Sequence, residues 1–156
     1  NAVKKMYVLP IHVPDMYLCK FLILTILLSV AAALQNLALT QIGIISLPEG
    51  TFELYTLIIF ALYSLITAMP ALSFMLFIAS RFENMWVPLG IGVAGFLSGM
   101  ALGTSKISLF LTDPFVVILK PAVSMSAEPD VSVIAIIETL LFLLAGLWMS
   151  AHTHYE

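Results

Sequence analysis

The chain has 156 residues, of which 62% are hydrophobic and only 10% are charged, with a formal net charge of −3 at pH 7. Soluble globular domains are about 45–50% apolar and about 25% charged, so this composition excludes a water-soluble domain, in agreement with the mean hydropathy of +1.11. The six Lys and Arg residues are scattered, which excludes a basic surface for nucleic acid. The single cysteine, Cys19, excludes an intrachain disulfide and a Cys-rich metal site.

The first 20 residues are more polar than the rest of the chain and are expected to form a cytoplasmic segment of their own. Apolar residues around Lys4 and Lys5 predict a short helix over 2–8, and Leu-Pro-Ile at 9–11 predicts a turn. A second helix is expected to begin at 13–15, because proline and an acidic residue both favour the first turn of a helix. The chain begins with Asn and lacks a signal-peptide pattern, so we expect that truncation removed an upstream part.

Four later stretches are apolar and long enough to cross a bilayer, whose core of about 30 Å requires about 20 helical residues. Backbone groups in lipid must be satisfied within the segment, which predicts helices rather than strands. We therefore predict an all-α polytopic transmembrane helix bundle, with about four spans in a transmembrane domain of residues 21–151. The predicted spans are 21–42, 54–78, 87–103 and 131–150.

Polar turns at 46–53 and 80–86 connect the first three spans, and basic residues favour one side of the membrane. Lys4, Lys5, Lys20 and Arg81 lie on the side of the N-terminus, and Lys106 and Lys120 lie on the other side. Because basic residues are enriched in cytoplasmic connections, and Tyr17 and Trp86 are typical of the same boundary, we predict a multi-pass cell-membrane protein. Its N-terminus and its tail, residues 152–156, would be cytoplasmic. The outer connections would then carry Glu49, Glu53, Asp113, Glu128 and Asp130.

The outer connection 104–130 is long and contains a predicted short helix. Asp113-Pro114 is typical of a helix start, with an acidic N-cap followed by proline. The apolar run after it ends at Lys120-Pro121 and is too short to span the membrane, so we predict an interfacial or re-entrant helix over the bundle. The alternative is that the third span continues to residue 111, with the Lys106 side chain reaching back to the interface.

Glu138 is the most informative single residue, because it lies about 10 Å below the outer boundary of the fourth predicted span at 1.5 Å per residue. A carboxylate at such a depth costs a few kcal/mol on insertion scales and usually faces the bundle interior or a wet cavity. Glu138 could attract a cationic substrate, relay a proton or pair with a partner helix. Alternatively, it is a protonated carboxyl that hydrogen-bonds Gln35, Asn36 or a serine. Glu138, Gln35 and Asn36 are thus the candidates for a substrate path.

Small residues and a proline indicate how the helices pack. Gly95, Gly99 and Gly103 repeat every four residues and predict close helix packing, with a partner in this chain or in another one. Pro70 is predicted to kink the second span, and the hydroxyls of Ser64, Thr67 and Ser73 could satisfy the carbonyl that it frees.

No set of residues predicts a metal site or a catalytic centre. His152 and His154 are two residues apart on a short tail, where their side chains would diverge in a helix, and His12 has no partner at a ligand spacing. The sequence contains no P-loop, GxSxG or HExxH motif. We therefore expect neither an enzyme nor a bound cofactor.

Residues 6–21 read MYVLPIHVPDMYLCKF, and residues 77–92 contain a short polar turn followed by Pro-Leu-Gly-Ile-Gly. The stretch 6–21 resembles the cytoplasmic segment before the third span in permease subunits of type-2 ABC exporters, especially those of lantibiotic immunity and peptide-antibiotic resistance. The stretch 77–92 is similar to that family's connection from the fourth to the fifth span. His12 and Val13 replace the hydroxyl and basic residues that are common in the family's turn.

The resemblance implies a six-span permease, of which this chain holds the last four spans. It also implies that residues 4–14 form a coupling helix, which fits a cleft on a separate ATP-binding cassette subunit that carries ATP and Mg²⁺. The coupling residues would be Lys4, Lys5, Met6, Leu9, Pro10, Ile11 and His12. A second permease subunit, identical or related, would complete the transporter in the lipid membrane. The implied function is ATP-driven export of cationic peptides or other amphipathic toxins from the membrane, and the alternative is a non-transporting scaffold or assembly subunit.

Overall fold

Apolar composition and the need to satisfy backbone groups in lipid lead to helices throughout the described chain. The computed structural model describes residues 13–46, 53–103, 111–124 and 126–152, and within these ranges it contains helices and turns but no strand. The coupling residues predicted between Lys4 and His12, and His154 of the tail, lie outside the described residues. The helices are α2 (Val13–Ser46), α3 (Leu54–Ala79), α4 (Trp86–Leu102), α5 (Pro114–Ser124) and α6 (Pro129–His152).

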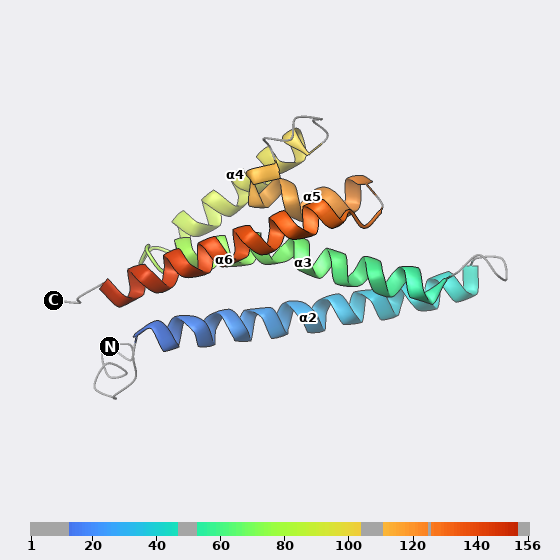
Figure 1. The fold of residues 1–156 in the computed structure, drawn as a ribbon, viewed down its shortest axis with the longest axis horizontal. Helices are drawn as coiled ribbons and strands as arrows, with labels where there is room; N and C mark the ends of the chain where they lie inside the picture. Colours follow the sequence, from blue (N-terminus) through green and yellow to red (C-terminus); the bar gives the residue numbers. More distant parts are fainter. Residues whose placement is uncertain (1–12, 47–52, 104–110, 125, 153–156) are drawn as a thin grey trace.

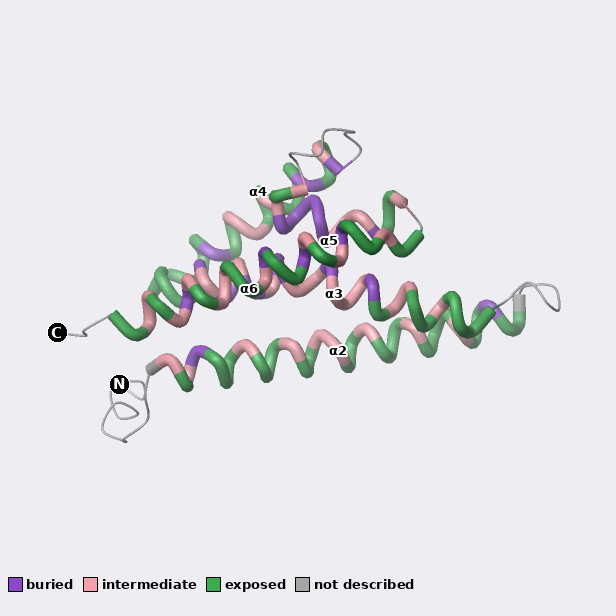
Figure 2. The backbone as a smooth tube through the Cα atoms, viewed as in Figure 1, coloured by how far each residue is buried: buried purple, intermediate pink, exposed green. Residues whose placement is uncertain are grey.

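The bundle is built around α3, which packs against each of the other described helices. Figure 1 shows α2 antiparallel to α3, and α6 running in the same direction as α3, so that the start of α2 and the end of α6 lie at the same end of the molecule. Within the most apolar stretch of each long helix, the share of residues buried inside the protein is 33% for α3, 22% for α6 and 6% for α2. Helix α2 is therefore the peripheral member of the bundle, and α3 is its centre (Figure 2).

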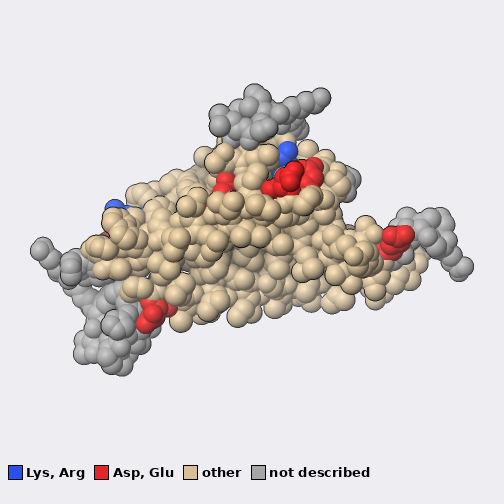
Figure 3. Space-filling view, viewed as in Figure 1, with Lys and Arg blue, Asp and Glu red and all other residues tan. Residues whose placement is uncertain are grey.

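The outward faces of the helices are apolar. Leu22, Leu62, Leu97 and Leu141, one on each of the four longer helices, are all more than half exposed. Figure 3 shows the charged residues near the ends of the molecule and around α5, with a broad uncharged surface elsewhere. An apolar surface of this extent is incompatible with water and compatible with lipid. Among the described helices α2, α3 and α6 are long and apolar enough to cross a membrane, whereas α4 and α5 are shorter. The protein is a membrane-embedded helical bundle.

The short helix α5 is separate from α4, because α4 ends at Leu102 and does not continue to residue 111. Its start matches the prediction: the Phe115 amide donates to Asp113 Oδ1 at 2.9 Å, which caps the first turn. The predicted end at Lys120-Pro121 is wrong, since the helix continues through Pro121 to Ser124. Proline removes one backbone donor, and the hydroxyl of Ser124 donates to the carbonyl of Lys120 at 3.0 Å, which helps to close the last turn.

The core lies where α3, α5 and α6 meet. Its buried residues are Tyr63, Val117, Val131 and Ala135. About three turns further along α3, Phe74 contacts Phe115 of α5 edge to face at 5.8 Å and Phe142 of α6 at 5.0 Å between ring centroids. Aromatic pairs in these geometries add to the energy of burial, so α5 is held to the bundle along its length.

Candidate functional site: a buried carboxyl on α6

Glycines on α4 allow α5 to approach closely. A Cβ at Gly95 would collide with the ring of Phe115, and a Cβ at Gly99 would lie 2.6 Å from the Phe115 carbonyl oxygen. The predicted small-residue face of the third span thus packs on α5 of the same chain at two of its three positions. Gly103 meets only the backbone of its own helix, and Gly92 faces Met75 of α3.

The two ends of α5 lie at different depths in the bundle. At its last turn, Ser124 lies near the Tyr63 hydroxyl, which is also close to the backbone of Glu128 just before α6, although that hydroxyl has no hydrogen-bond partner among the described residues. At its first turn, the carboxyl of Asp113 interacts electrostatically with that of Glu138 on α6. Glu138 is about 15 Å along the chain from Glu128 at 1.5 Å per residue. Helix α5 therefore runs antiparallel to α6 (Figure 1), and whether it is re-entrant or interfacial stays a prediction.

Glu138 is buried between the helices, with a side chain that is 5% exposed. It lies on the inward face of α6, with Ala135 and Phe142 at positions one turn away. Neither of its carboxyl oxygens has a hydrogen-bond partner among the described residues. The alternative that Glu138 hydrogen-bonds Gln35, Asn36 or a serine is therefore not seen among the described residues. The polar group that acts on its carboxyl electrostatically is instead Asp113, a second acid.

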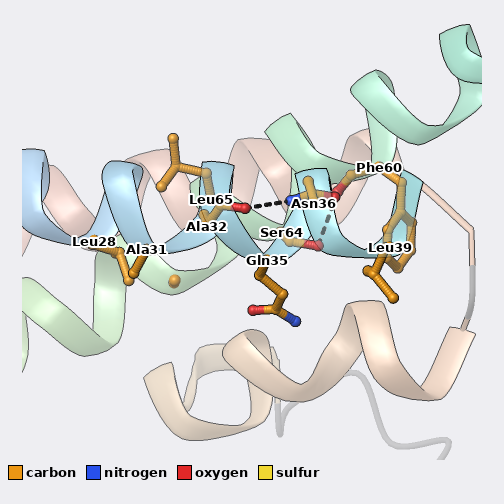
Figure 4. A pocket seen from close by; sticks show the side chains of 10 residues that line it. Leu28, Ala31, Ala32, Gln35, Asn36, Leu39, Phe60, Ser64 and Leu65 are labelled. Atoms are coloured by element: carbon orange, nitrogen blue, oxygen red, sulfur yellow. Dashed lines mark hydrogen bonds between the residues drawn. The ribbon is translucent and has the colours of Figure 1, made fainter. Parts of the chain in front are cut away.

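Gln35 and Asn36 line a different place, a groove of about 240 Å³ between α2 and α3. The Asn36 amide donates to the Ala32 carbonyl at 2.8 Å, and the Ser64 hydroxyl, on the opposite wall, donates to the Phe60 carbonyl at 2.9 Å. Gln35 is exposed and extends away from these two side chains (Figure 4). None of these hydrogen bonds leads to Glu138, so the described structure does not join the three predicted substrate-path residues in one site.

Pro70 is fully buried within α3, which continues through it from Leu54 to Ala79. The hydroxyls around it donate to carbonyls other than that of Ile66, the one four residues back that the proline frees. Thr67 donates to the carbonyls of residues 63 and 64, both at 3.1 Å, and Ser73 donates to that of Pro70 at 2.9 Å. The kink at Pro70 stays a prediction.

Tyr17 and Gly146 form a contact that sequence reasoning missed. Tyr17 was expected at the membrane boundary, but its ring is buried, 4% exposed, and its hydroxyl sits on Gly146 of α6. That hydroxyl has no hydrogen-bond partner among the described residues. Gly146 is the one glycine in the predicted fourth span, and this was the signal that could have revealed the close approach of α2 and α6.

The described residues contain no group of three or more His, Cys, Asp and Glu side chains that could hold a metal ion. Comparisons with known protein families, curated proteins and solved structures find no match to this chain.

Proposed function

We propose that this chain is a permease subunit of an ATP-driven exporter of the type-2 ABC class and contains the last four of its six spans. The observation that carries the proposal is Glu138, a carboxyl buried between apolar helices without a hydrogen-bond partner among the described residues. Ionisable groups inside membrane bundles are costly, and they mark substrate, ion or proton paths. A purely structural scaffold gains nothing from such a carboxyl, so Glu138 favours a transporter.

The lengths of the helices support four spans. Helix α4, with 17 residues, extends about 25 Å, which is at the short end of the range of about 17–25 residues for a transmembrane helix. It runs from the turn at 80–85 towards the re-entrant helix. A re-entrant helix before the last span would close the outer side of a path between the spans.

The ATPase subunit would dock at the end of the molecule where α2 begins. The turn between α3 and α4, with Arg81, and the end of α6 lie at this same end (Figure 1). Residues 4–14 lead into α2, which begins at Val13, so a motion imposed on them would move α2 along its length. ATP and Mg²⁺ would be bound by the partner, a second permease subunit would face this one, and both termini of this chain would be cytoplasmic.

The substrate would be a cationic amphipathic molecule, such as a peptide toxin, that is removed from the membrane. Glu53 and Glu128 lie just before α3 and α6, at the end of the molecule opposite the start of α2 (Figure 1), and would attract it, and Glu138 would receive its charge. The test is transport and toxin resistance in cells that carry Glu138→Gln, with Asp130→Asn as the matched control on the same helix. Unchanged transport in Glu138→Gln would refute the role of this residue.

Partnership with an ATPase is tested by co-purification from membranes. We expect capture of a Walker-type ATPase, weakened by Lys4→Glu with Lys5→Glu and by the helix-breaking Met6→Pro. Lys120→Glu, at the opposite end, should leave it intact. Stable capture of another membrane protein without any ATPase would overturn the exporter proposal in favour of the scaffold alternative.

A further inference from the structure

Gln35 is a polar side chain on the exposed surface of α2, at a depth where water is not available. It lies seven residues before the end of the predicted span 21–42, which is about 10 Å inside that span at 1.5 Å per residue. Its side chain is exposed, and among the described residues its amide has no hydrogen-bond partner (Figure 4). An unpaired amide in the hydrocarbon of a bilayer is costly, so Gln35 favours a partner from outside the bundle.

Other polar side chains of the spans have less need of such a partner. Asn36 of α2 and the exposed Ser98 of α4 each donate to a carbonyl of their own helix at 2.8 Å. Gln41 is the other exposed amide among the described residues of α2, but it lies only four residues before the end of the apolar stretch at Ile45. This distance is about 6 Å, within reach of headgroups and water. Gln35 is therefore the exposed amide of α2 that requires a partner inside the bilayer.

Gln35 belongs to a seam along α2, the Gln35 seam, which consists of Ala31, Gln35, Ala38, Ile42 and Ile45. All five side chains are exposed, and their spacing alternates between four and three residues, as in helices that pack along one another. Alanine lies one turn from Gln35 on either side, so a second helix can approach closely enough for the amide to reach it. Helix α2 is available for this contact, because only 6% of its most apolar stretch is buried inside the protein.

We propose that the Gln35 seam is the contact surface for the α2 helix of a second copy of this chain, with the two Gln35 amides hydrogen-bonded to each other. A carboxamide contains both donors and an acceptor, so two of them related by a two-fold axis form two reciprocal hydrogen bonds. Two copies inserted in the same orientation place this residue at the same depth. Any other partner would have to supply its own polar group there. A single polar residue in an apolar seam also fixes the register of the two helices.

In the exporter this seam would face the second permease subunit, and to that extent the inference rests on the proposed function, but the contact can be measured without transport. Chains labelled with a donor or an acceptor fluorophore are reconstituted in phosphatidylcholine liposomes, and energy transfer is followed as added lipid dilutes the protein. We expect the wild type to associate and Gln35→Leu to associate about threefold to thirtyfold more weakly. Gln41→Leu, the matched control, should behave as wild type. Gln35→Asn keeps the carboxamide and should retain more association than Gln35→Leu.

Cross-linking locates the contact independently of the affinity. In a Cys19→Ser background, Ala38→Cys on the seam should form a disulfide-linked dimer on oxidation in membranes, and adding Gln35→Leu should reduce its yield. Leu37→Cys is the matched control, because Leu37 is 60% exposed but lies about 100° around the helix from Ala38. It should form little dimer.

A monomeric wild-type protein, equal association of wild type and Gln35→Leu, or equal cross-linking at positions 37 and 38 would overturn the Gln35 seam. A monomer that still captures an ATPase would leave the exporter proposal in place, with a related rather than an identical second subunit. Conversely, a dimer that depends on Gln35 in a protein without any ATPase partner would support the seam and overturn the exporter.

Discussion

A methyl group added at Gly99 tests the contact between α4 and α5 most directly. Its Cβ would lie 2.6 Å from the carbonyl oxygen and 2.8 Å from the carbonyl carbon of Phe115. Ordinary contact begins at 3.4 Å, so the backbone of α5 would have to retreat by about 0.8 Å. A backbone carbonyl inside a helix cannot rotate away, and the Phe115 side chain is already fixed against Phe74. Gly99→Ala should therefore loosen α5.

The magnitude follows from two opposing effects. Overpacking costs typically about 1–3 kcal/mol, whereas alanine favours a helix over glycine by about 0.8–1 kcal/mol. Gly99→Ala should thus lower the free energy of unfolding by up to about 2 kcal/mol. Gly90 is the matched control on the same helix, because nothing lies within 4 Å of its added Cβ. Gly90→Ala should leave the protein as stable as before or raise its stability by up to about 1 kcal/mol.

A second pair of variants separates side-chain from backbone collisions. At Gly95 the added Cβ meets the ring of Phe115, so Gly95→Ala should be destabilising alone and largely relieved by Phe115→Leu. At Gly99 the obstacle is the backbone of Phe115, so Phe115→Leu should give no relief. The assay is unfolding in mixed micelles by added sodium dodecyl sulfate, followed by circular dichroism. Equal stability of Gly99→Ala and Gly90→Ala, or equal relief by Phe115→Leu at both positions, would refute this account of the packing.

Three further tests address other contacts and the orientation of the protein. Tyr17→Phe removes a buried hydroxyl that has no partner among the described residues and should leave the stability unchanged or raise it by up to about 1 kcal/mol. Gly146→Ala, whose added Cβ would meet the Tyr17 ring, should lower the stability by up to about 2 kcal/mol in the same unfolding assay. Asp113→Ala removes the cap of α5 and should cost about 1 kcal/mol, with Asp113→Asn close to wild type; a cost shared by both variants would contradict the capping role. In a cysteine-free background, a membrane-impermeant maleimide should label Glu53→Cys in intact cells and Glu83→Cys only in inside-out vesicles, and the reverse pattern would invert the proposed topology.

Much of the helical framework was predictable because it depends on local composition. The predicted spans 54–78 and 87–103 agree with α3 and α4 to within one or two residues. Pro and Gly mark the turns, and long apolar runs in lipid leave the backbone no alternative to a helix. The start of α5 was predictable for the same reason, since Asp-Pro forms a helix cap from neighbouring residues alone. Its end was not, because a proline near the last turn of a helix is tolerated when packing holds the helix.

The candidate site was predictable only in part, because its members come from different helices. The position of Glu138 within a predicted span was enough to identify it as a candidate. No pattern in the sequence indicated that Asp113 would interact with it electrostatically. In water, an amphipathic helix shows which face is buried. Here lipid is as apolar as the protein interior, so the leucines of α6 do not distinguish the two environments. Glycines were the remaining indicator, and they identified Gly95 and Gly99 but could not show that Phe115 occupies the space beside them.

The unequal lengths of α2 and α4 have a consequence for the surrounding lipid. The apolar part of α2, Pro14–Ile45, has 32 residues, whereas the whole of α4 has 17, which correspond to about 48 Å and 25 Å at 1.5 Å per residue. Against a hydrocarbon core of about 30 Å, α2 is matched by tilting or by stretched acyl chains, and in the proposed four-span topology α4 is matched by compressed ones. In that topology the bilayer next to this protein would change thickness from one side to the other, which would favour residence at the border between thick and thin lipid.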